Sequence, residues 1–372
     1  MSPITSSGKP SKTLISKEES AARIFSAEAE NTKKTSNGTR ILIATGLFPP
    51  DIGGPAQYAK HLHDELRKQG HTVHAVSFRR ERNLPPGIRH FFYCMRILPY
   101  VRTCDYIIAM DTFSVGFPAV LAAVIYGKRI AIRIGGDFLW ESYVERAKKA
   151  VTLKEFNRSM PHLNIKERII FRVSRFTLRH ASVLAFNSEW QKNMFRDSYT
   201  LDPKKLFVIE NFYGEKIEGR EPVKKNFLWA GRMMYLKNTD MLKRAFADAR
   251  KKRNDISLEM ITGMRYEDLK EKIRECYAVI LPSLSDVHPN FIIDALQMNK
   301  PFIMTRESGV RERLSDTGLF IHPNDERDLT EKILFLADDT NYKEYAKRAE
   351  AFRYTHSWEN MAREFTDLYQ KI

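Results

Sequence analysis

The sequence contains very little cysteine. Its three cysteines, Cys94, Cys104 and Cys276, stand among 372 residues, and their spacing fits no metal-ligand pattern. An odd number of thiols cannot all pair, so we expect no disulfide framework and infer a reducing, cytoplasmic compartment.

Long hydrophobic runs are also missing. The longest uncharged stretch, Thr112 to Gly127, has 16 residues and is interrupted by Gly116 and Pro118. A membrane-spanning helix needs about 20 apolar residues, so this stretch predicts a buried helix instead. Residues 1–39 hold six bulky apolar residues among Ser, Thr, Lys and Glu, which predicts a flexible tail rather than a signal peptide.

Positive charge and a sizeable core are what the chain does have. Lys plus Arg number 61 against 46 Asp plus Glu, giving a formal charge of +15, and 43% of the residues are hydrophobic. The length is enough for two domains. The charge favours an anionic partner such as a nucleotide, a nucleic acid or an acidic membrane face, and does not choose among them.

Two segments bear on that choice. The apolar stretch 91–102 contains two arginines, and residues 165–179 predict a basic amphipathic helix. Both fit peripheral attachment to anionic lipid at the inner membrane face, although a solvated surface helix is the simpler reading of 165–179. No nucleic-acid motif is present and the charge is spread over many helices, so we expect no nucleic-acid partner.

Short apolar runs alternate with helical patterns from residue 41 to the C-terminus. Repeated βα units imply an α/β fold with parallel sheets. Strands are predicted at 41–45, 72–78, 105–110, 129–134, 183–186, 206–210, 227–230, 257–262, 277–281, 301–305 and 318–321.

A break in this pattern suggests where one domain ends. Residues 214–225 contain two glycines, a proline and seven charged residues, as expected of a linker. We predict an N-terminal domain over 40–217, a C-terminal domain over 218–354, and a final helix within 355–372 that crosses back to the first domain.

The stretch from Leu281 to Leu296 has the layout of a binding site. An apolar strand ends in a polar loop that carries Asp286, and the following helix carries Asp294. In a parallel sheet, ligands bind beyond the carboxyl ends of the strands, where helix N-termini attract anions. Two acids there would suit a ligand with phosphate and hydroxyl groups; the alternative is that both are ordinary solvated or capping acids.

Three other strand ends carry candidate residues. Gly53 and Gly54 let the backbone approach a phosphate, although adjacent glycines are more often just a turn. Arg232 and Lys237 follow a strand five residues apart and suit a diphosphate clamp, with unliganded surface charges as the alternative. Asp137 follows a strand and two glycines, where it either faces the same site or caps the next helix.

Taken in order, these pieces resemble the retaining glycosyltransferases of family 4. The matching motifs run from Arg40 to Ile372 and are Phe48-Pro-Pro-Asp-Ile-Gly-Gly54, Gly70-His-Thr-Val73, Asn187-Ser-Glu-Trp-Gln191, Val208-Ile-Glu-Asn211, Gly231-Arg232, Lys237-Asn238, Leu281-Pro-Ser283, Pro301-Phe-Ile-Met-Thr305, Gly309 and Gly318-Leu-Phe-Ile-His-Pro323. The resemblance implies the GT-B fold, in which two Rossmann-like domains with parallel sheets face each other.

The resemblance also implies roles for the candidate residues. A nucleotide-sugar donor would bind mainly to the second domain, and an acceptor to the first. Arg232 and Lys237 would hold the diphosphate without a metal or other cofactor, helped by amides near Gly54 and Asn290, and Phe291 would lie in the same donor segment.

The family's Glu-x7-Glu is replaced here by two aspartates. By carry-over, Asp286 would contact the donor sugar and Asp294 the ribose, each with a reach one methylene shorter. Some relatives place a histidine in the first domain near the acceptor, where this sequence has Arg133-Ile-Gly-Gly-Asp137, so Asp137 is the substitute candidate. The family's additional strand and helix are missing from 263–276, which predicts an abbreviated second domain.

The function implied is transfer of a hexose, with retention, from a nucleotide diphosphate sugar to a glycan or lipid-linked acceptor. The alternative is a catalytically inactive sugar-nucleotide-binding protein of the same fold. The shortened second domain and the two Asp-for-Glu changes are the features that favour the alternative.

Overall fold

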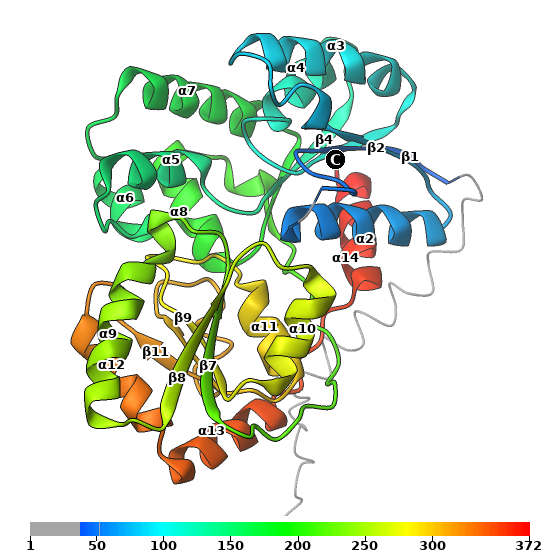
Figure 1. Cartoon of the computed structure of the whole chain (residues 1–372). Helices are drawn as coiled ribbons and strands as arrows, with labels where there is room; N and C mark the ends of the chain where they lie inside the picture. Colours follow the sequence, from blue (N-terminus) through cyan, green and yellow to red (C-terminus); the bar gives the residue numbers. More distant parts are fainter. Residues whose placement is uncertain (1–37, 52) are drawn as a thin grey trace, which may run out of the picture. The chain divides into compact units, whose positions relative to one another are not determined.

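The computed structural model describes residues 38–51 and 53–372. The tail predicted for residues 1–39 lies outside this range except for its last two residues. Thr39–Ile372 form one compact unit that contains two parallel β-sheets (Figure 1).

The first sheet has six parallel strands in the order β2-β1-β3-β4-β5-β6. They are β1 (Arg40–Thr45), β2 (Thr72–Ser77), β3 (Tyr106–Ala109), β4 (Arg129–Ile134), β5 (Val183–Phe186) and β6 (Leu206–Val208). Strand β1, next to the edge strand β2, pairs with both neighbours and places Ile41 opposite Val73 and Tyr106. Strand order therefore reverses beside β1, and the loops that follow the strands share one edge.

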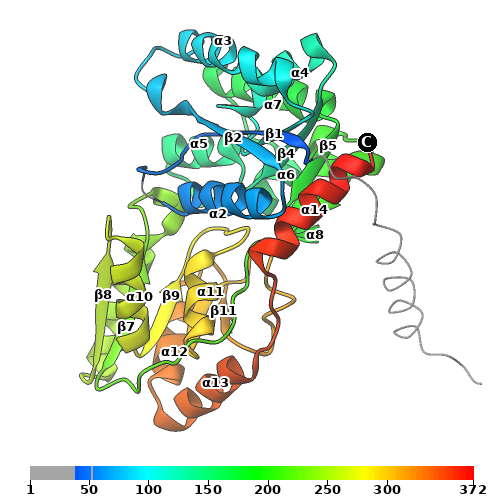
Figure 2. The ribbon, with the colours of Figure 1, turned by 90° about the vertical axis from the view of Figure 1, so that its right-hand side faces the viewer.

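Helices cover both faces of this sheet (Figures 1 and 2). On one face, α3 (Ile88–Thr103) and α4 (Gly116–Tyr126) pack over Leu42 and Ala44. On the other, α2 (Gly54–Lys68) and α14 (Trp358–Gln370) pack over Ile41 and Ile43. The alternation of residues along β1 thus divides the core into two layers.

The remaining helices of this half begin at side-chain caps. They are α5 (Phe138–Ala147), α6 (Leu153–Ser159), α7 (Ile165–His180) and α8 (Glu189–Tyr199). Asp137 caps α5, and capping boxes start α6 and α7. Because such caps satisfy the free amides of the first turn, each start is fixed by local sequence.

The second sheet has five parallel strands in the order β11-β10-β9-β7-β8. They are β7 (Lys225–Ala230), β8 (Ile256–Ile261), β9 (Ala278–Leu281), β10 (Phe302–Thr305) and β11 (Leu319–Ile321). The helices are α9 (Thr239–Lys252), α10 (Tyr266–Glu275), α11 (Asn290–Gln297), α12 (Glu326–Leu336) and α13 (Asp339–Ala351). Short 3-10 turns occupy η1 (Phe78–Arg80), η2 (Pro203–Lys205) and η3 (Tyr235–Lys237).

Two cores cover the faces of this sheet as well. One face packs against α9 and α12, and the other against α10 and α11. The connection from β8 to β9 is the single helix α10, so this sheet has one strand fewer than the first. The abbreviated second domain, expected from the stretch 263–276, stays a prediction.

Each predicted strand lies at a strand of the structure, with ends that differ by at most two residues. The domain limits at 217 and 218 fall in the segment between β6 and β7, and they remain a prediction because Thr39–Ile372 form a single unit. Helix α14 packs against α2 and the first sheet.

The uncharged stretch 112–127 differs from its prediction. It forms α4, but only one side of that helix is buried, and Leu121, Val124 and Ile125 are exposed. The reason is that α4 lies on the outer surface of the sheet's helical layer. Among the described residues, no helix is long and apolar enough to cross a membrane.

Candidate functional site

An ion pair lies where two neighbouring strands of the second sheet end. Lys237 closes η3 after β7, and Asp286 lies in the loop after β9. The Lys237 Nζ donates to Asp286 Oδ2 at 2.8 Å, and both side chains keep some exposure to solvent. The pair thus stands at the carboxyl edge of the sheet, where parallel folds bind ligands.

The backbone around this pair is held by its neighbours. Asn238, next to Lys237, donates from Nδ2 to the carbonyl oxygens of Pro282 and Pro323 at 3.3 and 2.7 Å. The amide of Asp286 donates to the Glu307 carbonyl at 3.0 Å. Because these bonds join the loops that follow β7, β9, β10 and β11, the position of the ion pair is set by the sheet below it.

Two helix N-termini approach each other at the candidate site. Gly53 caps α2 with φ 134° and ψ 163°, a conformation that favours glycine. A Cβ atom added to Gly54 would lie 3.3 Å from Nδ2 of Asn290, the first residue of α11. In the first turns, the amides of Ala56 and Ile292 donate back to the carbonyl oxygens of Gly53 and Pro289, and Pro55 has no amide. The amides of Gly54 and Asn290, at the very start of the two helices, suit an anion.

Asp294 lies on the second turn of α11 and is buried. Its Oδ1 accepts a hydrogen bond from the Tyr266 hydroxyl at 2.8 Å. Burial raises the pKa of Asp294 to about 6, and the bond from Tyr266 acts in the opposite direction. Asp294 is therefore neither a solvated nor a capping acid, and its first partner within the chain is a tyrosine of α10.

The side chain of Glu141 on α5 is a member of this neighbourhood that sequence reasoning missed. Burial raises the pKa of Glu141, while the charges of Arg232 and Lys237 lower it and those of Asp137 and Asp286 add to the rise. Arg232 is exposed after β7, and its charge acts on Glu141 as that of Lys237 does. The available signal was position, since Glu141 lies in the first turn after a glycine-containing strand end.

Asp137 is buried and caps α5. Its Oδ1 accepts from the amides of Leu139 and Trp140 at 3.0 and 3.1 Å, and burial raises its pKa. This is the capping arrangement that was the alternative for Asp137. Its catalytic role remains a prediction, because a carboxylate that holds two amides has less freedom to contact a substrate.

His288, in the loop before α11, is a second residue that the motifs did not single out. It is buried, its ring packs edge-on against Tyr213 at 5.1 Å, and burial together with Arg133 lowers its pKa to about 3. The Arg133 guanidinium stacks over the Tyr58 ring and donates to Asn211. Phe291 is half-buried and packs against the core beneath α11.

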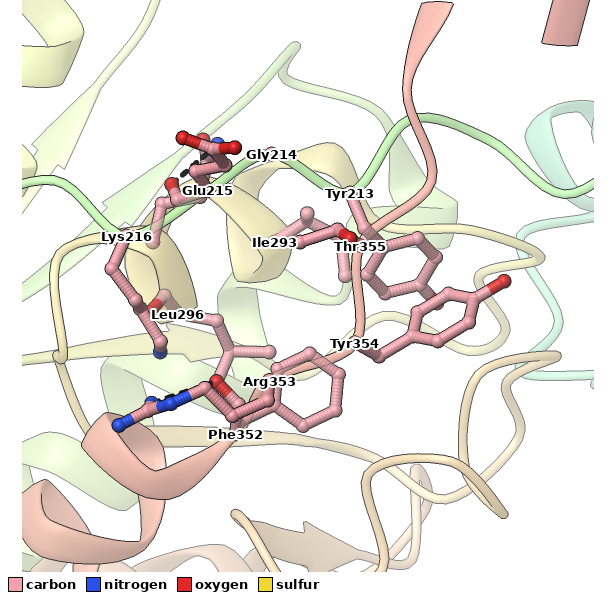
Figure 3. A pocket seen from close by; sticks show the side chains of 11 residues that line it. Tyr213, Gly214, Glu215, Lys216, Ile293, Leu296, Phe352, Arg353, Tyr354 and Thr355 are labelled. Carbon is pink, nitrogen blue, oxygen red and sulfur yellow. Dashed lines mark hydrogen bonds between the residues drawn. The ribbon is translucent and has the colours of Figure 1, made fainter. Parts of the chain in front are cut away.

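A cavity of about 200 Å³ lies beside α11, and one of its lining residues is Tyr213, the partner of His288 (Figure 3). The Phe352 and Tyr354 rings line it together with Leu296, and the lysine at its edge, Lys216, donates to the carbonyl oxygens of Leu296 and Ala349 at 2.6 and 2.5 Å. Burial lowers the pKa of Lys216 to about 8. Since these bonds tie α11 to the end of α13, we assign the cavity a structural role.

Two family models match this chain. The family model "Glycosyltransferase Family 4" matches residues 52–213, and the model "Glycosyl transferases group 1" matches residues 257–339. An uncharacterized glycosyltransferase of Methanocaldococcus jannaschii is 26% identical over 124 residues, a match that covers 32% of this chain and 35% of that protein.

Solved structures share the architecture at low sequence identity. Sucrose-phosphate synthase from Thermosynechococcus elongatus has a TM-score of 0.67 at 14% identity, with 90% of this chain and 98% of that chain covered. WaaG, a glycosyltransferase involved in lipopolysaccharide biosynthesis, has 0.66 at 12% identity over 88% and 99%. Anabaena HepE, solved with UDP, has 0.61 at 13% identity over 90% and 100%.

Two parallel sheets, the matches to two glycosyltransferase family models and the architecture shared with solved structures identify a glycosyltransferase of the GT-B fold. The chain belongs to the family 4 glycosyltransferases.

Proposed function

We propose that this glycosyltransferase moves a hexose, with retention, from a nucleotide diphosphate sugar to a glycan or lipid-linked acceptor, and that it does so without a metal ion. Its three cysteines have no disulfide partner, which supports work in a reducing, cytoplasmic compartment.

The observation that carries this proposal is the meeting of two helix N-termini near a lysine. The starts of α2 and α11 lie together at Gly54 and Asn290, and Lys237 stands at the end of the neighbouring strand β7. Transfer releases a nucleoside diphosphate whose negative charge grows as the glycosidic bond breaks. Amides and a lysine fixed before the reaction stabilise that charge without reorganising, which lowers the barrier.

Asp286 would act together with Lys237. In the free protein its carboxylate neutralises the lysine at 2.8 Å. When a donor binds, its diphosphate would take over the lysine and its sugar hydroxyls would supply donors to the carboxylate. The Lys237–Asp286 pair would thus be replaced by two pairs, lysine with diphosphate and carboxylate with sugar hydroxyls. Neither charge would be left unpaired, which would cost several kcal/mol in a desolvated site.

Related structures support a nucleotide donor. Anabaena HepE has been solved with UDP and glucose and with UDP-glucose. The fold it shares with this chain makes a uridine nucleotide a sensible first probe, while the base, sugar and acceptor used here are open to assay.

Replacing Lys237 with alanine tests the proposal. We expect Lys237→Ala to lower the rate of sugar transfer by about 100-fold or more, as loss of one charge-stabilising group does elsewhere. Transfer by the wild type should persist in excess EDTA. Radiolabelled donors and an acceptor panel of glycans and lipid-linked glycans would measure both rates.

The matched control is Lys251→Ala, because Lys251 also pairs with an aspartate, Asp248, but on the exposed side of α9. Equal rates for Lys237→Ala and the wild type would contradict the assigned phosphate site. Loss of transfer in EDTA that added Mg²⁺ restores would contradict metal independence alone.

One observation favours a second function, that of a binding protein without transfer activity. The Tyr266 hydroxyl already occupies Asp294, the acid proposed for the ribose, and it comes from the shortened β8–β9 connection. Calorimetric binding of a nucleotide sugar with no turnover on any acceptor would favour this second function.

A further inference from the structure

Helix α3 is apolar on two opposite sides. Its inner side, with Tyr93, Ile97 and Val101, is fully buried in the first core. Its outer side carries Phe91 and Phe92, whose side chains are 61% and 53% exposed. A surface helix of a globular protein normally turns a polar stripe to water, so the outer side of α3 lacks the expected character.

Helix α4 presents a similar stripe beside it. Leu121, Val124 and Ile125 are exposed, with Ile125 at 64%. Because α3 and α4 pack side by side on one face of the first sheet (Figure 1), their outer stripes point the same way, away from that sheet.

Together with Leu84, which precedes α3, these stripes hold most of the exposed large apolar side chains of the described residues. Nine of the sixteen among the described residues lie between Leu84 and Ile125. Scattered single apolar residues are ordinary on a protein surface, but a gathering of this kind marks an interaction site. We call it the α3–α4 surface, formed by Leu84, Ile88, Phe91, Phe92, Met95, Tyr100, Leu121, Val124 and Ile125.

The charges around the α3–α4 surface are mainly positive. Arg102 continues the outer stripe of α3, seven residues after Met95, and exposed Arg80 precedes the helix. Arg82 is exposed as well, but it pairs with Asp51 at 3.2 Å. Neither α3 nor α4 contains an acidic residue. The one acid between Phe78 and Thr103, Glu81, is buried and paired with Arg96 at 2.6 Å.

We propose that the α3–α4 surface docks on an anionic lipid bilayer. Its aromatic and aliphatic side chains would enter the boundary between headgroups and acyl chains, and its arginines would meet lipid phosphates. A second copy of this chain suits the surface less, because two such faces would bring arginine against arginine with no exposed acid between them.

The proposal does not depend on the function proposed above, since it concerns helices away from the ion pair of Lys237. If both hold, the first domain would lie against the membrane and a lipid-linked acceptor could be taken from it directly.

Vesicle co-sedimentation of the full chain tests this surface. We expect binding to phosphatidylglycerol-containing vesicles to exceed binding to pure phosphatidylcholine by about tenfold and to weaken in 0.5 M salt. Phe91→Ala/Phe92→Ala should lower the partition coefficient by about tenfold or more, because two aromatic anchors are lost. The control Val223→Ala/Phe335→Ala removes exposed apolar residues elsewhere and should bind as the wild type does.

Three outcomes would overturn the proposal. They are no vesicle binding by the wild type, equal binding by Phe91→Ala/Phe92→Ala, and a dimer in sedimentation velocity that this variant converts to a monomer. If the variant has a lowered melting temperature, Val124→Ser/Ile125→Ser on α4 makes the same test with different exposed residues.

Discussion

The side chain of Asp294 is buried, and yet the role proposed for it requires a negative charge. Burial raises its pKa to about 6 from the ordinary value of 3.8. At neutral pH the carboxylate is therefore ionised at a cost to folding. Acids kept ionised against such a cost are characteristic of binding sites, although structural networks also contain them.

The cost of ionising Asp294 should appear in the pH dependence of the protein's stability. Between about pH 4 and pH 6 the folded state keeps a proton on Asp294 that the unfolded state has released, so stability falls as pH rises through that window. At pH 7 the loss amounts to about 3 kcal/mol, from about two pKa units. We expect Asp294→Asn to raise the free energy of unfolding by up to about this amount at pH 7, and by much less at pH 4.

Urea unfolding at both pH values measures the difference between variant and wild type. Asp367→Asn, at an exposed aspartate of α14, serves as the control. If the difference in unfolding free energy between Asp294→Asn and the wild type is no larger at pH 7 than at pH 4, the account is contradicted. The same variant should bind donor more weakly, since a gain of stability at a functional acid commonly costs activity.

The individual residues of the site could be predicted from the sequence better than the contacts between them. Lys237 and Asp286 were identified from their places after strands, although their ion pair was not predicted. The bond between Tyr266 and Asp294 was missed, because it joins residues 28 apart whose approach depends on how α10 crosses α11. Glu141 was missed for the same reason, since its place after a glycine-containing strand end does not show that α5 packs against η3.

At the scale of elements, α14 returns the end of the chain to the first sheet. Its buried residues Met361, Phe365 and Leu368 pack with α2 and the first sheet, although β11, α12 and α13, which precede it in the chain, belong to the second sheet and its covering helices. The antiparallel bridge of Tyr213 and His356 holds together the two segments that pass between the sheets.

Replacing one buried phenylalanine of α14 tests how much the packing of this helix contributes to stability. Phe365 has no exposed surface, so we expect Phe365→Ala to lower the free energy of unfolding by about 3–5 kcal/mol through lost burial and an unfilled cavity. Phe335→Ala, at an exposed phenylalanine of α12, should cost less than about 1 kcal/mol. Chemical unfolding of both variants decides this, and equal losses would mean that α14 is dispensable for stability.

The elements were largely predictable because their signals are local. Strands appeared as apolar runs, and the helix of residues 165–179 as an amphipathic pattern, since burial imposes these periods directly. The outer side of α4 was not predicted, because the sequence shows only an uncharged stretch. Which side of it remains exposed depends on neighbours that the stretch does not encode.

On the scale of the whole molecule, one apolar cluster joins helices of the first sheet to loops of the second. Trp140 of α5 and Phe156 of α6 share it with Leu236, Leu284 and Val287. Beside it, the amide of Leu153 donates to the Ser285 Oγ at 2.9 Å. The loops that carry Lys237 and Asp286 are therefore braced from both halves of the unit.

The overall fold was predicted from the resemblance rather than from composition. Alternating strands and helices imply parallel sheets, but two sheets in a single compact unit did not follow from that pattern, and the linker-like stretch 214–225 favoured separate domains. Contacts such as that of Leu153 with Ser285 join residues 132 apart, and periodicity carries no information about them.

Donor binding to Lys237 is the central claim, and thermal unfolding with a panel of nucleotide sugars tests it most directly. A donor at about 100 times its dissociation constant should stabilise the wild type and Lys251→Ala by about 2.7 kcal/mol, and Lys237→Ala by much less. Stabilisation of Lys237→Ala equal to that of the wild type, or no stabilisation of the wild type by any nucleotide sugar, would contradict the account.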